Sequence, residues 1–138
     1  MASNYKTAVA PRNAALDAIG ARLNNGKIEI RTGSQPSNIT DASTGTLLAS
    51  PTYGATAFGS AANGVITANA IASDTNAAAS GDAGYFREYA SGAADTAAES
   101  EGTAGETGDS PDLVFDNKTI TATGTVAISS MTKTLPEQ

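Results

Sequence analysis

Ser130-Met131-Thr132-Lys133 is a place in this sequence where residue types and spacing could do chemistry. The S-x-x-K pattern belongs to serine acyl-enzymes, in which a lysine one helical turn from the serine takes its proton. Residues 125–135 instead alternate in a β pattern, which places Ser130 and Lys133 on opposite faces. The companion S-D-N and K-T-G motifs are absent from the sequence. The pattern therefore favours a structural interpretation over a catalytic one.

A second candidate for a functional site is a cluster of acidic residues. Glu106, Asp109, Asp112 and Asp116 lie within the stretch GETGDSPDLVFD and carry the oxygen ligands that calcium prefers. Their spacing matches no EF-hand loop, and Asp109-Ser110-Pro111-Asp112 has the composition of a turn. We expect a turn, with a surface calcium site as the lesser alternative. The sequence does not single out any pair of carboxylates at glycosidase distance.

The stretch AGYFREYA, residues 83–90, contains three of the seven aromatic residues around Arg87. As a strand, it would place Tyr85, Arg87 and Tyr89 on one face and Phe86 on the other. Two interpretations stay open. Either Phe86 enters the core and the Tyr-Arg-Tyr face is solvated, or that face binds a partner, because Tyr and Arg are enriched at interface hot spots.

The composition excludes several classes of function. The chain has 138 residues, enough for one domain, and lacks Cys, His and Trp. This removes disulfides, thiolate nucleophiles, zinc sites built on Cys or His, and the usual near-neutral proton shuttle. We therefore expect no catalytic residues, no metal and no cofactor.

The charge and the apolar runs exclude two further classes of function. Scattered cations on a protein of pI about 4.4 argue against nucleic-acid binding. The sequence contains neither a signal peptide nor the ~20-residue apolar run of a membrane span, so we expect synthesis in the cytoplasm.

The large apolar side chains are few. Of the 55 hydrophobic residues 28 are alanine, and Leu, Ile, Val and Phe together number 21. A core of this kind stabilises a fold less than one rich in Leu and Val. We therefore expect association with other copies or another protein to supply stability.

The N-terminal residues 1–26 are predicted to form an arm followed by a short helix over residues 11–26. Pro11 suits the first turn, Asn25-Gly26 suits the end, and Leu16, Ile19 and Leu23 form an apolar stripe. A helix this short is marginal in water, so the stripe must rest on the following domain or on a neighbouring chain.

Residues 27–138 are predicted to form a β-sandwich domain. KIEIRT places Ile28 and Ile30 on one face of a strand and its charged residues on the other. Asn63-Gly64 indicates a two-residue hairpin, and Ser91-Gly92-Ala93-Ala94 a weaker one. The fold class is mainly β, an antiparallel β-sandwich or jelly roll of about eight or nine strands. The further β-type runs are residues 46–50, 55–60, 65–73, 83–90, 95–100, 112–116, 119–123 and 125–135.

The order of several segments resembles a group of small β-rich proteins encoded among the virion genes of tailed bacteriophages. These segments are ALDAIGARLNNGKIEIRTGSQP, TGTLLAS, AFGSAANGVITANAIASDTNAAASGDAGYFR and SSMTKTLP, and they span most of residues 14–136. The resemblance implies a non-enzymatic virion component on the capsid surface, a decoration or cement protein that binds the major capsid protein and forms a homotrimer. Where such sequences have a valine-bearing strand, this chain has DTAAESEGTAGETG, so residues 95–110 could instead form an exposed acidic loop.

Partner binding is expected at two places. Residues 1–33 carry five basic and two acidic groups, whereas residues 82–117 carry one basic and nine acidic groups. The basic N-terminal segment is the predicted docking element, because opposite charge favours encounter with an acidic neighbour. The predicted partner-binding residues are Arg12, Leu16, Ile19, Arg22, Leu23, Tyr85, Arg87 and Tyr89.

Two other roles remain alternatives. One is a neck or tail subunit of the same virion, which differs from a decoration protein in copy number. The other is a carbohydrate-binding module that uses Tyr53, Tyr85 or Tyr89 as stacking platforms.

Overall fold

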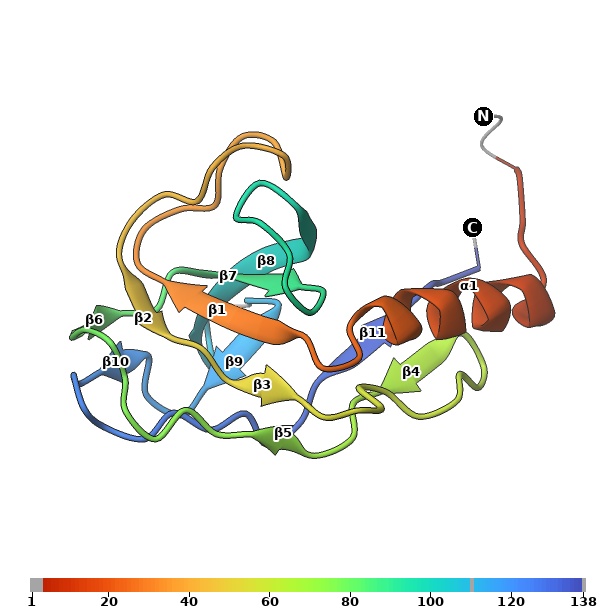
Figure 1. Ribbon diagram of the computed structural model, residues 1–138. Helices are drawn as coiled ribbons and strands as arrows, with labels where there is room; N and C mark the ends of the chain where they lie inside the picture. The colour runs from red at the N-terminus through yellow and green to blue at the C-terminus, as the bar shows by residue number, and fades with distance from the viewer. Residues whose placement is uncertain (1–3, 110, 138) are drawn as a thin grey trace.

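The computed structural model describes residues 4–109 and 111–137, which form one helix and eleven strands (Figure 1). The fold is mainly β and sandwich-like, with the helix at its N-terminal end, as the sequence predicts. The strands are β1 (Lys27–Arg31), β2 (Leu47–Ala49), β3 (Thr52–Tyr53), β4 (Val65–Thr67), β5 (Ile71–Ala72), β6 (Gly81–Asp82), β7 (Tyr85–Tyr89), β8 (Ala98–Glu106), β9 (Leu113–Phe115), β10 (Thr119–Ile120) and β11 (Thr132–Thr134).

The predicted helix is present as α1 (Val9–Arg22) and belongs to the same folded unit as the strands. Leu16 and Leu23 are buried in the shared core, and α1 lies against β4. Gly20 allows the helix to approach Phe58 closely, since a Cβ at Gly20 would lie 3.1 Å from Cβ of Phe58. The helix thus rests on its own domain. No helix in the described part of the chain is long and apolar enough to cross a membrane.

A seven-stranded sheet forms the centre of the molecule. Its order is β5-β3-β1-β7-β8-β9, and β2 pairs with the same edge of β1 as β3. Pro51 separates β2 from β3, and its carbonyl accepts a 2.8 Å bond from the N–H of Ile28. β1 and β7 pair antiparallel over five residues, with Glu29 opposite Arg87. Two small sheets, β10-β6 and β11-β4, complete the fold.

The prediction for residues 95–110 is corrected by β8. Ala98–Glu106 is a strand, the longest in the sheet, and it pairs antiparallel with β7. The lack of large apolar side chains, which suggested a loop, does not prevent the pairing, and small residues suit the strand where its neighbours come close. A Cβ at Gly102 would lie 2.9 Å from both Phe86 and Asp112, so the strand has no room for a side chain there.

Other predicted strands are only partly formed. The expected Asn63-Gly64 turn lies between residues 55–60 and 65–73, with both turn residues at positive φ and paired bonds between Ala62 and Val65. Residues 55–60, however, make only the isolated bridge of Phe58 to Ala68. Residues 125–131 are extended without joining a sheet, apart from a bridge at Val126. The β9 strand is parallel to β8, in contrast to the antiparallel pairing expected.

Candidate functional site

An open groove runs between β9 and the extended segment 125–131. Three adjoining cavities of about 360, 100 and 280 Å³ line up along it. The first two share Phe115, Asp116 and Ala127, and the last two share Leu113, Val114, Ser129 and Ser130. We call this continuous feature, bordered by residues 112–121 and 124–132, the β9 groove.

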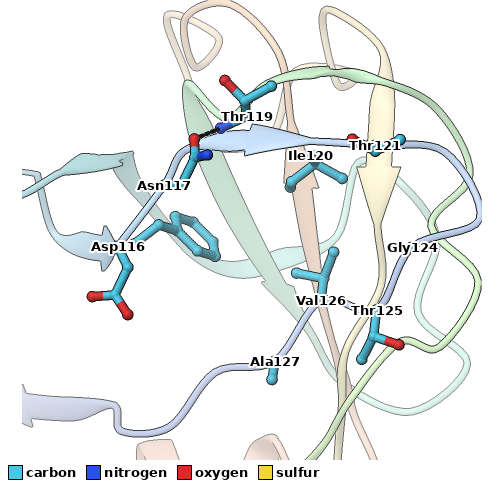
Figure 2. A pocket seen from close by; sticks show the side chains of 10 residues that line it. Asp116, Asn117, Thr119, Ile120, Thr121, Gly124, Thr125, Val126 and Ala127 are labelled. Atoms are coloured by element: carbon cyan, nitrogen blue, oxygen red, sulfur yellow. Dashed lines mark hydrogen bonds between the residues drawn. The ribbon is translucent and has the colours of Figure 1, made fainter.

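The floor of the β9 groove is apolar and its rim is polar. Figure 2 shows the wide end, where Ile120 and Val126 come from the two arms of one loop and point toward each other. Buried or half-buried apolar residues continue the floor: Leu113, Phe115, Ile128 and Met131. The exposed rim residues are Asp116, Asn117, Thr119, Thr121, Thr125, Ser129 and Ser130.

One wall of the groove is a sheet edge. β9 is the last strand of the seven-stranded sheet, so one row of its backbone N–H and C=O groups faces away from β8. Its central residue, Val114, is 53% exposed. An exposed apolar side chain on an open strand edge is a feature that an added strand would cover.

The opposite wall is irregular apart from an isolated bridge at Val126. Val126, Ile128 and Met131 are buried, whereas Ala127, Ser129 and Ser130 are exposed. The backbone groups of residues 127–130 have no backbone hydrogen-bond partner in the part of the chain that the structure describes. Two extended segments therefore face each other across the groove without pairing.

Carboxylates fasten the β9 wall. One carboxylate oxygen of Asp112 accepts bonds from the N–H and hydroxyl of Thr103, each 2.9 Å long. Asp109 lies 3.1 Å from Lys118 Nζ, and this hydrogen bond holds the pKa of Asp109 below its usual value. Among the residues described, no three His, Cys, Asp or Glu side chains gather to hold a metal ion. The predicted turn at residues 109–112 includes Ser110, which lies outside the described residues.

The loop at the wide end is held at its tip. Thr123 has φ of +66°, a left-handed conformation that is unfavourable for a β-branched residue. Its N–H donates to the carbonyl of Ala77 at 2.8 Å, and the Ala77 N–H donates to the carbonyl of Gly124 at 3.0 Å. These bonds fix the tip of the loop to Ala77, and the bond from the Gly124 N–H to the Thr121 carbonyl closes its turn.

This arrangement suits an extended peptide. Main-chain bonds to a free strand edge supply affinity in β-augmentation, and alternate side chains enter apolar pockets beside it. The β9 groove offers both features, together with exposed carboxylates that favour a basic ligand.

The Tyr-Arg-Tyr face of β7 is neither solvated nor open to a partner. Residues 34–46, which we call the cover loop, lie over it (Figure 1). Tyr85 and Arg87 are 0% exposed and Tyr89 is 1% exposed. Phe86 enters the core as the first interpretation expects, but the Tyr-Arg-Tyr face is not solvated, because the chain covers this face itself. The same cover corrects the second interpretation, in which this face binds a partner.

Arg87 is the centre of this closed face. Its Nε donates to Glu101 at 2.8 Å, and its Nη1 donates to the carbonyl of Asp41 at 2.8 Å. The Tyr85 hydroxyl bonds both backbone groups of Thr44, at 2.7 and 2.9 Å. The Tyr89 hydroxyl bonds Asp95. Each polar group on this face is thus satisfied within the chain.

A second buried polar cluster lies on the other face of β7, around Glu88. Its carboxylate accepts bonds from Tyr53, Ser100 and Lys133. Burial first, and then the Glu88 carboxylate, raise the pKa of Tyr53 well above its usual value. Tyr53 is only 4% exposed, so all three proposed sugar-stacking tyrosines lie inside the molecule.

The same cluster brings a serine and a lysine together. Lys133 Nζ lies 3.3 Å from the hydroxyl of Ser100, not beside Ser130 as the S-x-x-K motif would require. The Glu88 carboxylate contacts both Ser100 and Lys133 and holds them within one buried cluster. Ser130, the serine of the motif, is exposed and takes no part in this cluster, so the geometry supports a structural role.

The predicted helical partner residues have partners within the chain. Leu16 and Leu23 are buried, and Arg12 Nη1 donates to the carbonyl of Leu135 at 2.9 Å. Arg22 forms two bonds with Glu99, at 2.5 and 2.6 Å, and its side chain holds the pKa of Glu99 below its usual value. Ile19 is 37% exposed and keeps an apolar surface for a partner.

Comparison with known proteins does not add a name to this site: no family model, no curated protein and no solved structure matches the chain. The β9 groove was missed by sequence reasoning. The V-A-I-S-S-M run predicted one wall as a strand, but no local pattern says that a strand lacks a neighbour.

Proposed function

We propose that this chain is a non-enzymatic structural protein of a tailed-bacteriophage virion, which decorates the capsid exterior and stabilises it by binding the major capsid protein. The order of its sequence segments, which resembles that of small β-rich virion proteins, directs the proposal to this class. The observation that carries an assembly role is the β9 groove, where a free strand edge and an apolar floor await an extended segment.

Two further observations support the proposal. The chain has few large apolar residues, so that added contacts bring a substantial gain in stability. The interior charged groups bond one another: Arg87 with Glu101, and Lys133 with Glu88. Such pairs serve architecture, since each group already has its hydrogen-bond partner.

The copy number of the chain in purified virions tests the proposal. Quantitative mass spectrometry against the major capsid protein should give hundreds of copies per particle for a protein that covers the shell. Six or twelve copies would instead favour a neck or tail ring, because closed rotational symmetry sets those numbers. Absence of the chain from virions would contradict both roles.

Binding to the shell provides a second test. Heads purified without the chain should take it up to a saturating ratio in a sedimentation assay and should then resist heat better. Saturation without a change in the temperature of head disruption would contradict the stabilising role.

A further inference from the structure

We infer that the β9 groove binds the N-terminal arm, residues 4–8, of a second copy of this chain, and that the arm adds a strand beside β9. The inference rests on the proposed function only in treating the groove as an assembly surface, and it names the occupant of that surface.

The first argument is the state of the arm. Residues 5–8 precede α1 without regular structure, and Figure 1 shows them standing away from the body. Tyr5 is 51% exposed, a large apolar side chain without cover. The arm's ionic contact, Lys6 with Glu137 at 3.6 Å, joins two side chains that are 71% and 57% exposed. The arm is therefore free to exchange this contact for a better one.

The second argument is fit. Extended residues alternate, so Tyr5 and Thr7 would face the apolar floor while Lys6 faces the solvated rim. The rim carries the exposed carboxylate of Asp116, and residues 1–16 contain no acidic residue. Five extended residues cover about 17 Å, which matches the stretch 113–117 residue for residue. Charge, length and alternation thus agree.

The third argument is the position of the arm relative to the groove, which favours an arm from a second copy over the arm of the same chain. The arm leaves the molecule at the N-terminal end of α1, and β6 and β10 lie at the opposite end in Figure 1. The groove extends toward β10, whose Thr119 and Ile120 line its wide end. An arm that enters the groove of another copy from its wide end makes a head-to-tail contact, which closes into a ring when the rotation permits. A ring of three would be the homotrimer that the resemblance to virion proteins implies.

The first test measures the mass of the full chain in solution. Sedimentation equilibrium should give a mass above the 13.7 kDa of one chain. Ala127 is exposed and lies between two of the cavities, so Ala127→Trp should fill the groove and return the mass to that of one chain. Ala55→Trp, the same change at an exposed alanine outside the groove, should leave the mass unchanged. A monomeric parent chain, or an Ala127→Trp oligomer of parental mass, would overturn the inference.

A second test does not depend on how well that variant folds. The chain lacks cysteine, so single cysteines report one contact. Chains carrying Thr7→Cys, mixed with chains carrying Ala127→Cys, should form a disulfide-linked heterodimer under mild oxidation. Chains with Ala55→Cys in place of Ala127→Cys should not. Failure of the two single-cysteine chains to cross-link would contradict a second copy as the occupant. A chain that carries both Thr7→Cys and Ala127→Cys is the comparison: a disulfide that forms only within this chain would also contradict it.

A charge exchange identifies the register. Lys6→Glu should weaken association about fivefold, the range of an exposed ion pair. Adding Asp116→Lys should restore it, and no restoration would place the arm elsewhere. These outcomes are separate from the proposed function: a monomer that still coats phage heads would remove only the arm exchange, whereas a ring absent from virions would remove only the virion role.

Discussion

The closed face of β7 and the β9 groove differ in whether the chain supplies hydrogen-bond partners for the polar groups of a strand. Both place polar groups of a strand beside an irregular segment. Over β7, the cover loop reaches down and bonds Tyr85, Arg87 and Tyr89, so that all three are buried. Beside β9, residues 127–130 stay apart and the strand edge remains open. Burial of polar groups requires complete partners, and this chain supplies them at only one of the two places.

This difference predicts where substitutions affect folding and where they affect association. Changes on the closed face should lower stability, because its partners are all internal. Changes in the groove should spare stability.

Arg87→Met should have the largest effect, a loss of about 3–5 kcal/mol in the free energy of unfolding. The change leaves Glu101 buried without its cation and removes the donor to the Asp41 carbonyl. Urea denaturation measures the loss. Lys118→Met removes the exposed partner of Asp109 and should change little by comparison. A loss below about 1 kcal/mol for Arg87→Met, the size of a surface pair, would contradict the closed face as described.

Gly45→Ala should have the second-largest effect on stability, because a side chain at this position would displace the cover loop from β7. Gly45 has φ of +66°, and a Cβ there would lie 2.1 Å from the carbonyl oxygen of Thr32. We expect a loss of about 1–3 kcal/mol and a change in the near-ultraviolet circular dichroism of the tyrosines. Gly33→Ala is the matched control, since Gly33 has φ of +81° but its Cβ would meet nothing within 4 Å. Equal losses would show that backbone strain alone is responsible.

Acidification should loosen the closed face by a smaller amount. Bonds from the hydroxyl and N–H of Ser43 hold the pKa of Asp95 below its usual value. A lowered folded pKa gives stability that is present above the unfolded pKa, about 3.9, and is lost as the pH falls through the folded pKa. Ser43→Ala should therefore raise the pKa of Asp95 and flatten the acid loss. Carboxyl-carbon NMR titration and unfolding at several pH values check both; an unmoved Asp95 would contradict the assignment.

Groove substitutions should have the smallest effect on folding. Ala127→Trp and Ser130→Val should change the free energy of unfolding by no more than about 0.5 kcal/mol, because both residues are exposed. Thermal and urea unfolding measure this at concentrations where the chain is monomeric. A loss as large as that of Gly45→Ala would mean that the two walls meet in solution and that the groove is closed.

The sequence predicted the elements with strong periodicity. Ile28 and Ile30 share a buried face of β1 as expected, although Glu29 on the charged face is also only 6% exposed, and Leu16 and Leu23 mark the buried side of the helical segment. The alternation of residues 85–89 was also right. What covers the Tyr-Arg-Tyr face was not predictable, because the cover loop has no periodicity and Ser43 is 52 positions from Asp95 in the sequence.

Two features of the structure, β8 and the β9 groove, were not predicted from the sequence, and the reasons lie in individual residues. β8 was doubted because residues 95–110 have almost no large apolar side chains, yet the strand forms, and Gly102 and Gly105 leave space where Asp112 and Asp109 approach it. The groove escaped because the buried Val126 and Ile128 look like those of any strand. Pairing depends on the distance to a neighbour, which local composition does not encode.

The bond from Arg12 to the carbonyl of Leu135 has a consequence for synthesis. It joins positions 123 residues apart, and Leu135 in turn donates its N–H to Gly64, beside β11 and β4. A ribosome releases α1 before β11, so this bond can form only after the residues between its two ends have been made. The apolar stripe of α1 can pack on β4 earlier, and the bond from Arg12 then fixes the helix at a late step of folding.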